Sequence, residues 1–105
     1  MAWPLLIVAG FLEVGWALLL KESEGFSKPW PTVGFFVVGT GSIVLLTLAL
    51  RDLPVGTAYA AWTGIGAVGT ALFGIVLFNE STSGARLASI LLIVIGVVGT
   101  YVFGD

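Results

Sequence analysis

Glu13 is the residue of this chain whose type and position are best suited to chemistry. It is the only charged residue between Trp3 and Leu20, a stretch that is otherwise almost entirely apolar. Burying a carboxylate in such a stretch is costly, so acids found there usually face a cavity and bind protons or cations. None of the long apolar stretches contains a lysine or arginine that could pair with it. We therefore predict a functional role for Glu13.

The helical neighbours of Glu13 would give it a binding face. Gly10, Trp16 and Ala17 lie three or four residues away, and residues at those spacings share one side of a helix. Gly10 and Ala17 leave space beside the carboxylate. Trp16 offers an indole N–H that can donate to a carboxylate and a ring face that attracts cations. The alternative role for Trp16 is packing against lipid or anchoring at the membrane interface.

Two later stretches add polar groups that could line the same site. Tyr59 and Trp62 lie three residues apart, and each carries a polar group that needs a partner when buried. Ser42 is one of the few hydroxyls in residues 32–50, although a serine there often bonds its own helix backbone. Glycines follow at three nearby positions, namely Gly64, Gly66 and Gly69. A glycine cluster permits either a bend in the helix or close packing against a neighbour.

The elements that must position these residues are four apolar stretches, separated by polar turns. The stretches cover about residues 3–20, 32–50, 56–78 and 87–103, and each has the length of roughly 20 residues that a helix needs to cross a bilayer. Backbone groups in lipid must be satisfied within the segment, so helices are expected. The chain is 58% hydrophobic and only 10% charged, too few charges for a water-soluble surface. We predict an all-α membrane protein whose residues 1–105 form one domain of four transmembrane helices.

Composition excludes or disfavours several other classes of function. The chain has no histidine and no cysteine, which removes the commonest general base and all thiolate metal sites. It contains no phosphate-binding glycine loop, and its net charge of −2 disfavours nucleic acid. We therefore expect no metal, no cofactor and no enzymatic reaction. Acids outside the four stretches, such as Glu24 and Glu80, are expected to be solvated.

The charge balance and the small size favour an oligomer that lacks a strong preference for one orientation. Four spans would place Lys21, Lys28 and Arg86 on one side of the membrane. The other side would hold only Arg51, so the bias from positive charges is weak. Four short helices are also too few to enclose a solvated pathway. A face of mostly small residues in the last stretch could pack against a second copy; it comprises Ser89, Ile93, Gly96 and Thr100.

Three segments together resemble the small multidrug resistance family. They are Gly10–Ala17 (GFLEVGWA), Leu20–Pro31 (LKESEGFSKPWP) and Pro54–Gly66 (PVGTAYAAWTGIG). The likeness covers essentially the whole chain, including the order of the spans. Members of that family work as dimers of four-helix subunits, usually antiparallel, and exchange a cation for protons through the first-span glutamates. The resemblance therefore implies a dimeric helical bundle in which Glu13 of each subunit binds protons and substrate.

The segment around Glu13 resembles the guanidinium-exporting subtype of the family in particular. Trp16 one turn after Glu13, and Trp62 followed by Thr63 and Gly64, carry this likeness. Carried over residue by residue, the subtype's binding site comprises Gly10, Glu13, Trp16, Ser42, Tyr59 and Trp62. The likeness implies that Trp16 and Ser42 hold the carboxylate, while the rings of Tyr59 and Trp62 wall the site.

The implied activity is secondary transport in the inner membrane of a bacterium. A multi-pass homodimer would export guanidinium, or a related small organic cation, in exchange for protons, and the two ligands would compete for Glu13. Two alternatives remain open. The first is export of quaternary ammonium and other multidrug cations, which rely on charge and ring faces because they lack hydrogen-bond donors. The second is a role as one subunit of a heterodimeric transporter.

Overall fold

The structure, a computed structural model, describes residues 2–103, which form four α-helices. These are α1 (Ala2–Glu22), α2 (Pro29–Ala49), α3 (Val55–Phe78) and α4 (Gly84–Phe103). All four are long and apolar enough to cross a membrane. The prediction of an all-α membrane protein with four spans is confirmed, and the helix ends differ from the predicted ones by three residues at most.

Prolines and one left-handed residue fix several helix ends. α2 begins at Pro29, where the missing N–H costs nothing because the first helical N–H groups have no partner within the helix. Pro54 directly precedes α3. Asn79 ends α3 in the left-handed conformation with φ 54°, a common way to terminate a helix. This residue reverses the chain direction before α4.

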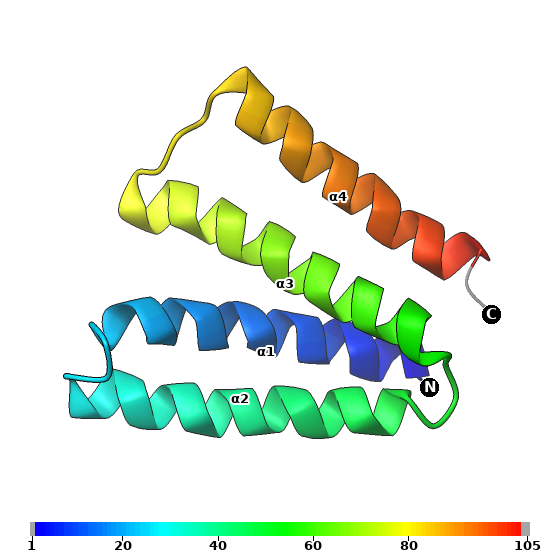
Figure 1. The fold of residues 1–105 in the computed structure, drawn as a ribbon, viewed down its shortest axis with the longest axis horizontal. Helices are drawn as coiled ribbons and strands as arrows, with labels where there is room; N and C mark the ends of the chain where they lie inside the picture. The colour runs from blue at the N-terminus through cyan, green and yellow to red at the C-terminus, as the bar shows by residue number, and fades with distance from the viewer. Residues whose placement is uncertain (1, 104–105) are drawn as a thin grey trace.

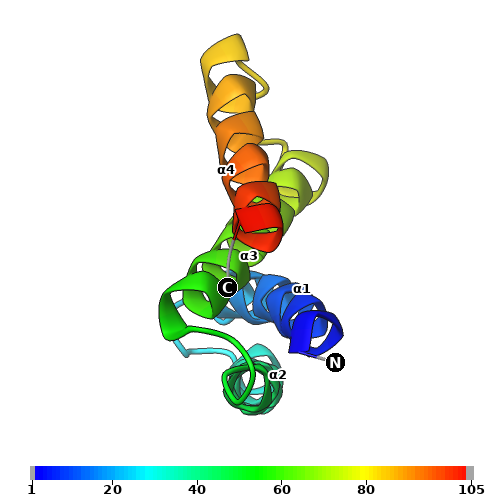
Figure 2. The same cartoon turned by 90° about the vertical axis from the view of Figure 1, so that its right-hand side faces the viewer.

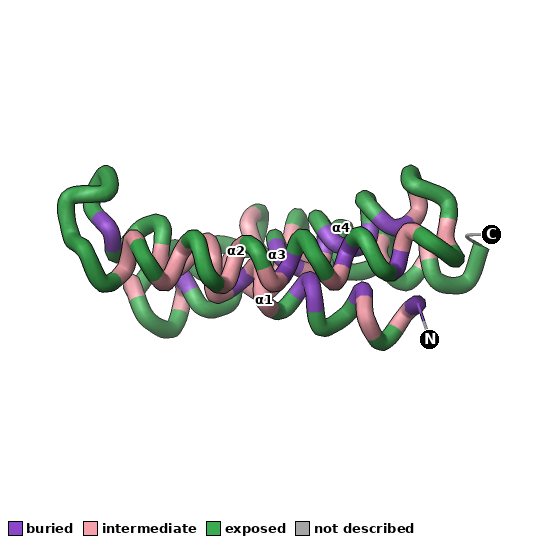
Figure 3. The backbone as a smooth tube through the Cα atoms, turned by 90° about the horizontal axis from the view of Figure 1, so that it is seen from below, coloured by how far each residue is buried: buried purple, intermediate pink, exposed green. Residues whose placement is uncertain are grey.

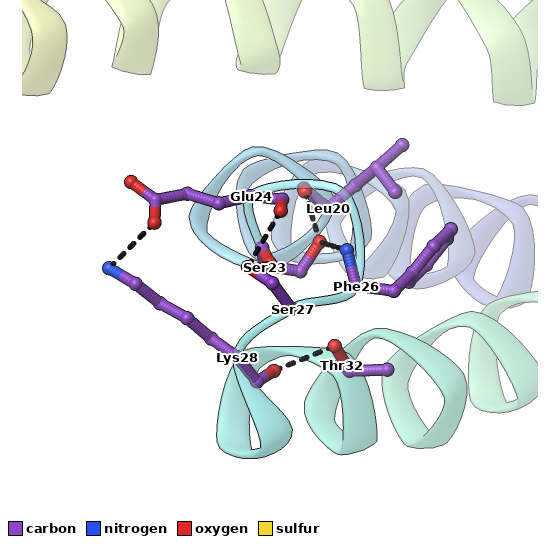
Figure 4. A network of polar contacts seen from close by, with 7 residues as sticks. All are labelled: Leu20, Ser23, Glu24, Phe26, Ser27, Lys28 and Thr32. Carbon is purple, nitrogen blue, oxygen red and sulfur yellow. Dashed lines mark hydrogen bonds and ion pairs between the residues drawn. The ribbon is translucent and has the colours of Figure 1, made fainter.

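The connection between α1 and α2 is a tight turn held by its own polar groups (Figure 4). Ser23 is fully buried; its hydroxyl donates to the carbonyl of Leu20 at 2.7 Å and accepts from the N–H of Phe26 at 3.2 Å. An exposed ion pair joins Lys28 to Glu24 at 3.3 Å. These contacts bring α2 back antiparallel beside α1.

The four helices lie side by side in a thin layer, in the order α2, α1, α3, α4 (Figures 1 and 2). α1 packs against both α2 and α3, whereas α4 packs against α3. The described chain measures 41 × 35 × 16 Å along its principal axes. Because an α-helix with its side chains is about 10–12 Å wide, most of this layer is one helix thick. A single chain therefore leaves both faces of the layer open.

The buried core is small and lies where α1, α2 and α3 meet, while most of the chain is exposed or only partly buried (Figure 3). It is built from eight side chains of the described residues: Ala2, Leu6, Ala9, Leu46, Ala49, Ala58, Ala61 and Trp62. Along Gly84–Phe103, α4 contains no buried residue. Exposed apolar side chains on this scale suit contact with lipid or with another protein chain.

Candidate functional site

Glu13 extends from the middle of α1 towards the backbone of α3. Its side chain ends against Gly66, where an added Cβ would lie 2.6 Å from Oε2 and 2.8 Å from Oε1. Oε2 is buried, and no group within residues 2–103 forms a hydrogen bond with it. A buried polar atom normally has a partner, so such an atom marks a place where a donor or cation is expected to bind.

A cavity of about 490 Å³ lies between α1 and α3, with Glu13 in its wall. Thr70 lines it in the middle of α3, one helical turn from Gly66. Lys21, near the end of α1, also lines the cavity and places its ammonium 5.0 Å from the ring centre of Phe78. The carboxylate thus belongs to a space large enough for a small organic cation.

Ser42 connects three helices through two hydrogen bonds. Its hydroxyl donates to the carbonyl of Ala9 in α1 at 2.7 Å and accepts from the indole N–H of Trp62 in α3 at 2.9 Å. Both Ser42 and Trp62 are buried. A serine hydroxyl has one hydrogen to donate, so Ser42 does not donate to Glu13 of the same chain. The structure therefore differs from the expectation that Ser42 holds the carboxylate, because a backbone carbonyl of α1 takes its hydrogen.

The predicted aromatic residues form a group around Trp62. The ring of Trp16 stacks on it with centroids 6.4 Å apart, and the ring of Tyr59 lies 5.5 Å away. Trp16 also contacts Phe35 of α2 at 5.5 Å. Tyr59 is 55% exposed in the single chain, so its ring is free to contact a ligand or another chain. The structure thus brings Trp16, Tyr59 and Trp62 together.

Gly10 is buried where α1 approaches α3. A Cβ at this position would lie 2.6 Å from Cγ2 and 2.8 Å from Cβ of Ile65. The glycine therefore permits the close approach of the two helices that carries Glu13 to Gly66. The space predicted beside the carboxylate at Gly10 is taken up by Ile65 of α3.

Sequence reasoning missed several residues of the cavity. The sequence predicts bending or packing for Gly66 rather than contact with Glu13, and it predicts that Glu80 is solvated. The exposure of Glu80 is confirmed, with 41% of its side chain accessible, and Glu80 and Arg86 also line the same cavity as Glu13. A usable signal was the four-residue spacing of Gly66, Thr70 and Gly74, which places small residues in one line along α3.

Fold and site together define a multi-pass membrane protein with an acid in a cavity of its membrane-spanning region. The chain belongs to the small multidrug resistance family, whose sequence model, described as Small Multidrug Resistance protein, matches residues 1–93. The family resemblance predicted from the motifs is thereby confirmed.

Curated relatives are similar over almost the whole chain. A protein named guanidinium exporter in Yersinia pseudotuberculosis is 54% identical over 99 residues, which cover 94% of this chain and 95% of that protein. The guanidinium exporter of Escherichia coli strain K12 is also 54% identical, with 94% of each chain covered. The guanidinium exporter of Salmonella thompson is 52% identical with the same coverage. The family and the names of these relatives indicate a transporter.

Proposed function

We propose that this chain is a proton-coupled antiporter that exports guanidinium and small substituted guanidinium cations across the bacterial inner membrane. The observation that carries the proposal is the carboxylate of Glu13, which lines a cavity between membrane-spanning helices and has a buried oxygen without a hydrogen-bond donor in residues 2–103. The substrate is supported by the relatives, which are named guanidinium exporters at 52–54% identity.

The chemistry of guanidinium suits a carboxylate in this setting. Its planar N–H groups can donate to both oxygens of one carboxylate as a fork, and its positive charge replaces the missing basic partner of Glu13. A proton on the carboxylate removes both the charge and one acceptor. Proton and guanidinium therefore exclude each other at Glu13, and this exclusion couples the outward movement of one to the inward movement of the other.

The remaining predicted residues shape the site in distinct ways. Ser42 and Trp62 join α1, α2 and α3 through their shared hydrogen bond, which fixes the indole ring in the aromatic group. Trp16 and Tyr59 pack their rings beside Trp62, and neither lines the cavity of Glu13. Gly10 sets the distance between α1 and α3. In this division of roles Glu13 binds the ligand from the cavity wall, while the other five residues lie outside that wall and belong to the neighbouring packing of α1, α2 and α3.

The working unit in this proposal is an antiparallel homodimer with two Glu13 carboxylates. The thin layer of one subunit supports it, because most of that layer is one helix thick and leaves both faces open. α4 supports it too: no residue within Gly84–Phe103 is buried, and a Cβ at Gly96 would meet open space. The predicted face with Ser89, Ile93 and Thr100 remains our candidate for contact with the second copy.

Transport currents from purified protein in proteoliposomes test the function. We expect guanidinium and methylguanidinium gradients to drive currents in the wild type, and Glu13→Gln to abolish them. Glu22→Gln is the matched control, because Glu22 undergoes the same chemical change at an exposed position of the same helix. Absence of guanidinium current in the wild type, together with a current driven by a tetraalkylammonium ion, would replace this proposal with multidrug export. Guanidinium transport by protein made from this chain alone would also exclude the need for a second, different subunit.

Antiparallel orientation is testable by labelling in intact cells. The chain has no cysteine, so Thr82→Cys, in the exposed connection before α4, provides a single label site. With two opposed subunits, an impermeant maleimide should label about half of the protein, and the rest only after permeabilisation. A short bifunctional maleimide should not join the two cysteines, since they lie on opposite membrane faces. Complete labelling from one side would contradict this arrangement.

A further inference from the structure

The cavity of Glu13 carries a second carboxylate, that of Glu80. After the left-handed residue Asn79, the chain turns back on α3, and the N–H of Glu80 donates to the carbonyl of Gly74 at 3.3 Å. This reversal brings the Glu80 side chain to the cavity instead of directing it away from the protein. The acid that its loop position predicts to be solvated is thus part of the cavity wall.

Glu13 and Glu80 are seated in the same way on α3. An added Cβ at Gly74 would lie 2.8 Å from the carboxylate carbon of Glu80 and 3.2 Å from its Oε2, as a Cβ at Gly66 would collide with the carboxylate of Glu13. The two glycines are separated by eight helical residues, a rise of about 12 Å along α3. One cavity therefore offers two carboxylates in succession along one helix.

The guanidinium group of Arg86 already occupies the carboxylate of Glu80. Arg86, in the first turn of α4, donates from Nη2 to Oε1 of Glu80 at 2.8 Å and from Nη1 to the carbonyl of Ser81 at 2.6 Å. The ion pair is partly exposed, with 28% and 41% of the two side chains accessible. It is also made to one carboxylate oxygen rather than as a fork to both. Such exposed pairs are weak and exchange readily.

We propose that Glu80 is a capture site for guanidinium at the end of the cavity nearest the α3–α4 connection. Arg86 occupies this site until a free guanidinium ion displaces it. The free ion can adopt the two-oxygen fork that Arg86, also tied to Ser81, does not make. From Glu80 the cation passes along the cavity to Glu13. This inference rests on guanidinium being the substrate, as proposed above. The alternative is an ion pair that only fastens the α3–α4 connection.

Variants of the pair separate these two roles through the guanidinium concentration that gives half-maximal transport, the apparent KM. Glu80→Gln removes the capture site and should raise the apparent KM about threefold or more, while Glu13 still supports the maximal rate. Arg86→Gln removes the built-in competitor and should lower the apparent KM by a similar factor. The double variant should behave like Glu80→Gln, because Arg86 has nothing left to compete for.

The matched control is Lys21→Gln, which removes the same charge from the same cavity without touching the Glu80 pair. If Arg86 acted only through its positive charge, Lys21→Gln would lower the apparent KM equally, and the capture site would be refuted. An unchanged or increased apparent KM in Arg86→Gln would also refute it, as would an unchanged value in Glu80→Gln.

A second measurement leaves the pair itself intact and does not depend on transport. The sequence contains two arginines, Arg51 and Arg86. An Arg51→Lys variant therefore keeps only Arg86, which assigns the side-chain ¹⁵N signal of that residue. In a Glu13→Gln background, which lacks the inner carboxylate, guanidinium chloride should still shift that signal. Tetramethylammonium chloride at equal concentration, which cannot donate hydrogen bonds, should not. Equal shifts with both salts would show that salt only screens the charges of the ion pair, and this result would overturn the proposal.

Failure of the proposed function and failure of the capture site give different results. Without any guanidinium current in the wild type, transport of guanidinium itself is excluded. If the wild-type current is normal and depends on Glu13, but the ¹⁵N signal of Arg86 does not shift when guanidinium is added, only the capture site is excluded.

Discussion

The carboxylate of Glu13 lies against the backbone of Gly66, at a point where any larger residue would collide with it. Gly66 is buried in α3, and the contact directs the only charged group within residues 3–20 into the cavity between α1 and α3. The position of this carboxylate is therefore set by a residue that has no side chain.

Gly66→Ala should impair transport without unfolding the protein. The new Cβ would fall within 2.8 Å of both carboxylate oxygens, and the end of a glutamate side chain can move aside cheaply. Alanine is also the better helix former, by about 1 kcal/mol. We expect guanidinium current to fall by about tenfold or more, in line with the cost of a misplaced catalytic or binding group, with an unchanged or higher melting temperature.

Gly56→Ala is the control for that change, because it lies in the same helix and its Cβ would meet open space. It should transport like the wild type. If Gly66→Ala transported guanidinium at the same rate as Gly56→Ala, the contact between Gly66 and Glu13 would have no effect on transport.

Gly10→Ala should act mainly on stability. Its Cβ would meet the Cβ of Ile65 at 2.8 Å, and this atom is fixed to the backbone of α3, so the helices must separate. Overpacking of this kind typically costs about 1–3 kcal/mol. Thermal unfolding in detergent, followed by circular dichroism, should show a lower midpoint. Gly15→Ala, whose Cβ would lie an ordinary 3.5 Å from Val38, should change the midpoint much less.

Ser42 and Trp62 should be energetically coupled. Ser42→Ala leaves the buried indole N–H without its acceptor, and Trp62→Phe removes the donor. In a double-mutant cycle on unfolding free energy, the two changes should deviate from additivity by about 0.5–1 kcal/mol, the size found for hydrogen bonds between membrane helices. Strict additivity would mean that the hydrogen bond does not form in the folded protein.

Much of the fold could be predicted because the bilayer leaves few alternatives. A polar break on each side of a run such as 56–78 fixes a spanning helix to within a few residues, and α3 covers Val55–Phe78. The order of the four helices within the thin layer could not be predicted. Apolar residues lie on all sides of each helix, so the sequence does not mark one face as the one that packs in the core.

The candidate site could be predicted in its residues but less well in its contacts. Glu13 is conspicuous because a charge is rare in lipid, whereas Gly66 resembles any other glycine of α3 until the register of α1 against α3 is known. The partner of Ser42 depends on a different register, that of α1 against α2, which presents the carbonyl of Ala9 to it. Glu80 is exposed as its loop position predicts, but its place on the cavity wall could not be predicted, because it depends on the chain reversal at the left-handed residue Asn79. Such a reversal has only a weak sequence signal.

Competition between protons and guanidinium for Glu13 is tested most directly by proton release from the purified protein. Guanidinium added to weakly buffered wild-type protein should release protons in proportion to the fraction of sites filled. Glu13→Gln should release none, whereas Glu22→Gln should match the wild type. Equal proton release from Glu13→Gln and the wild type would contradict the claim that proton and cation share this carboxylate.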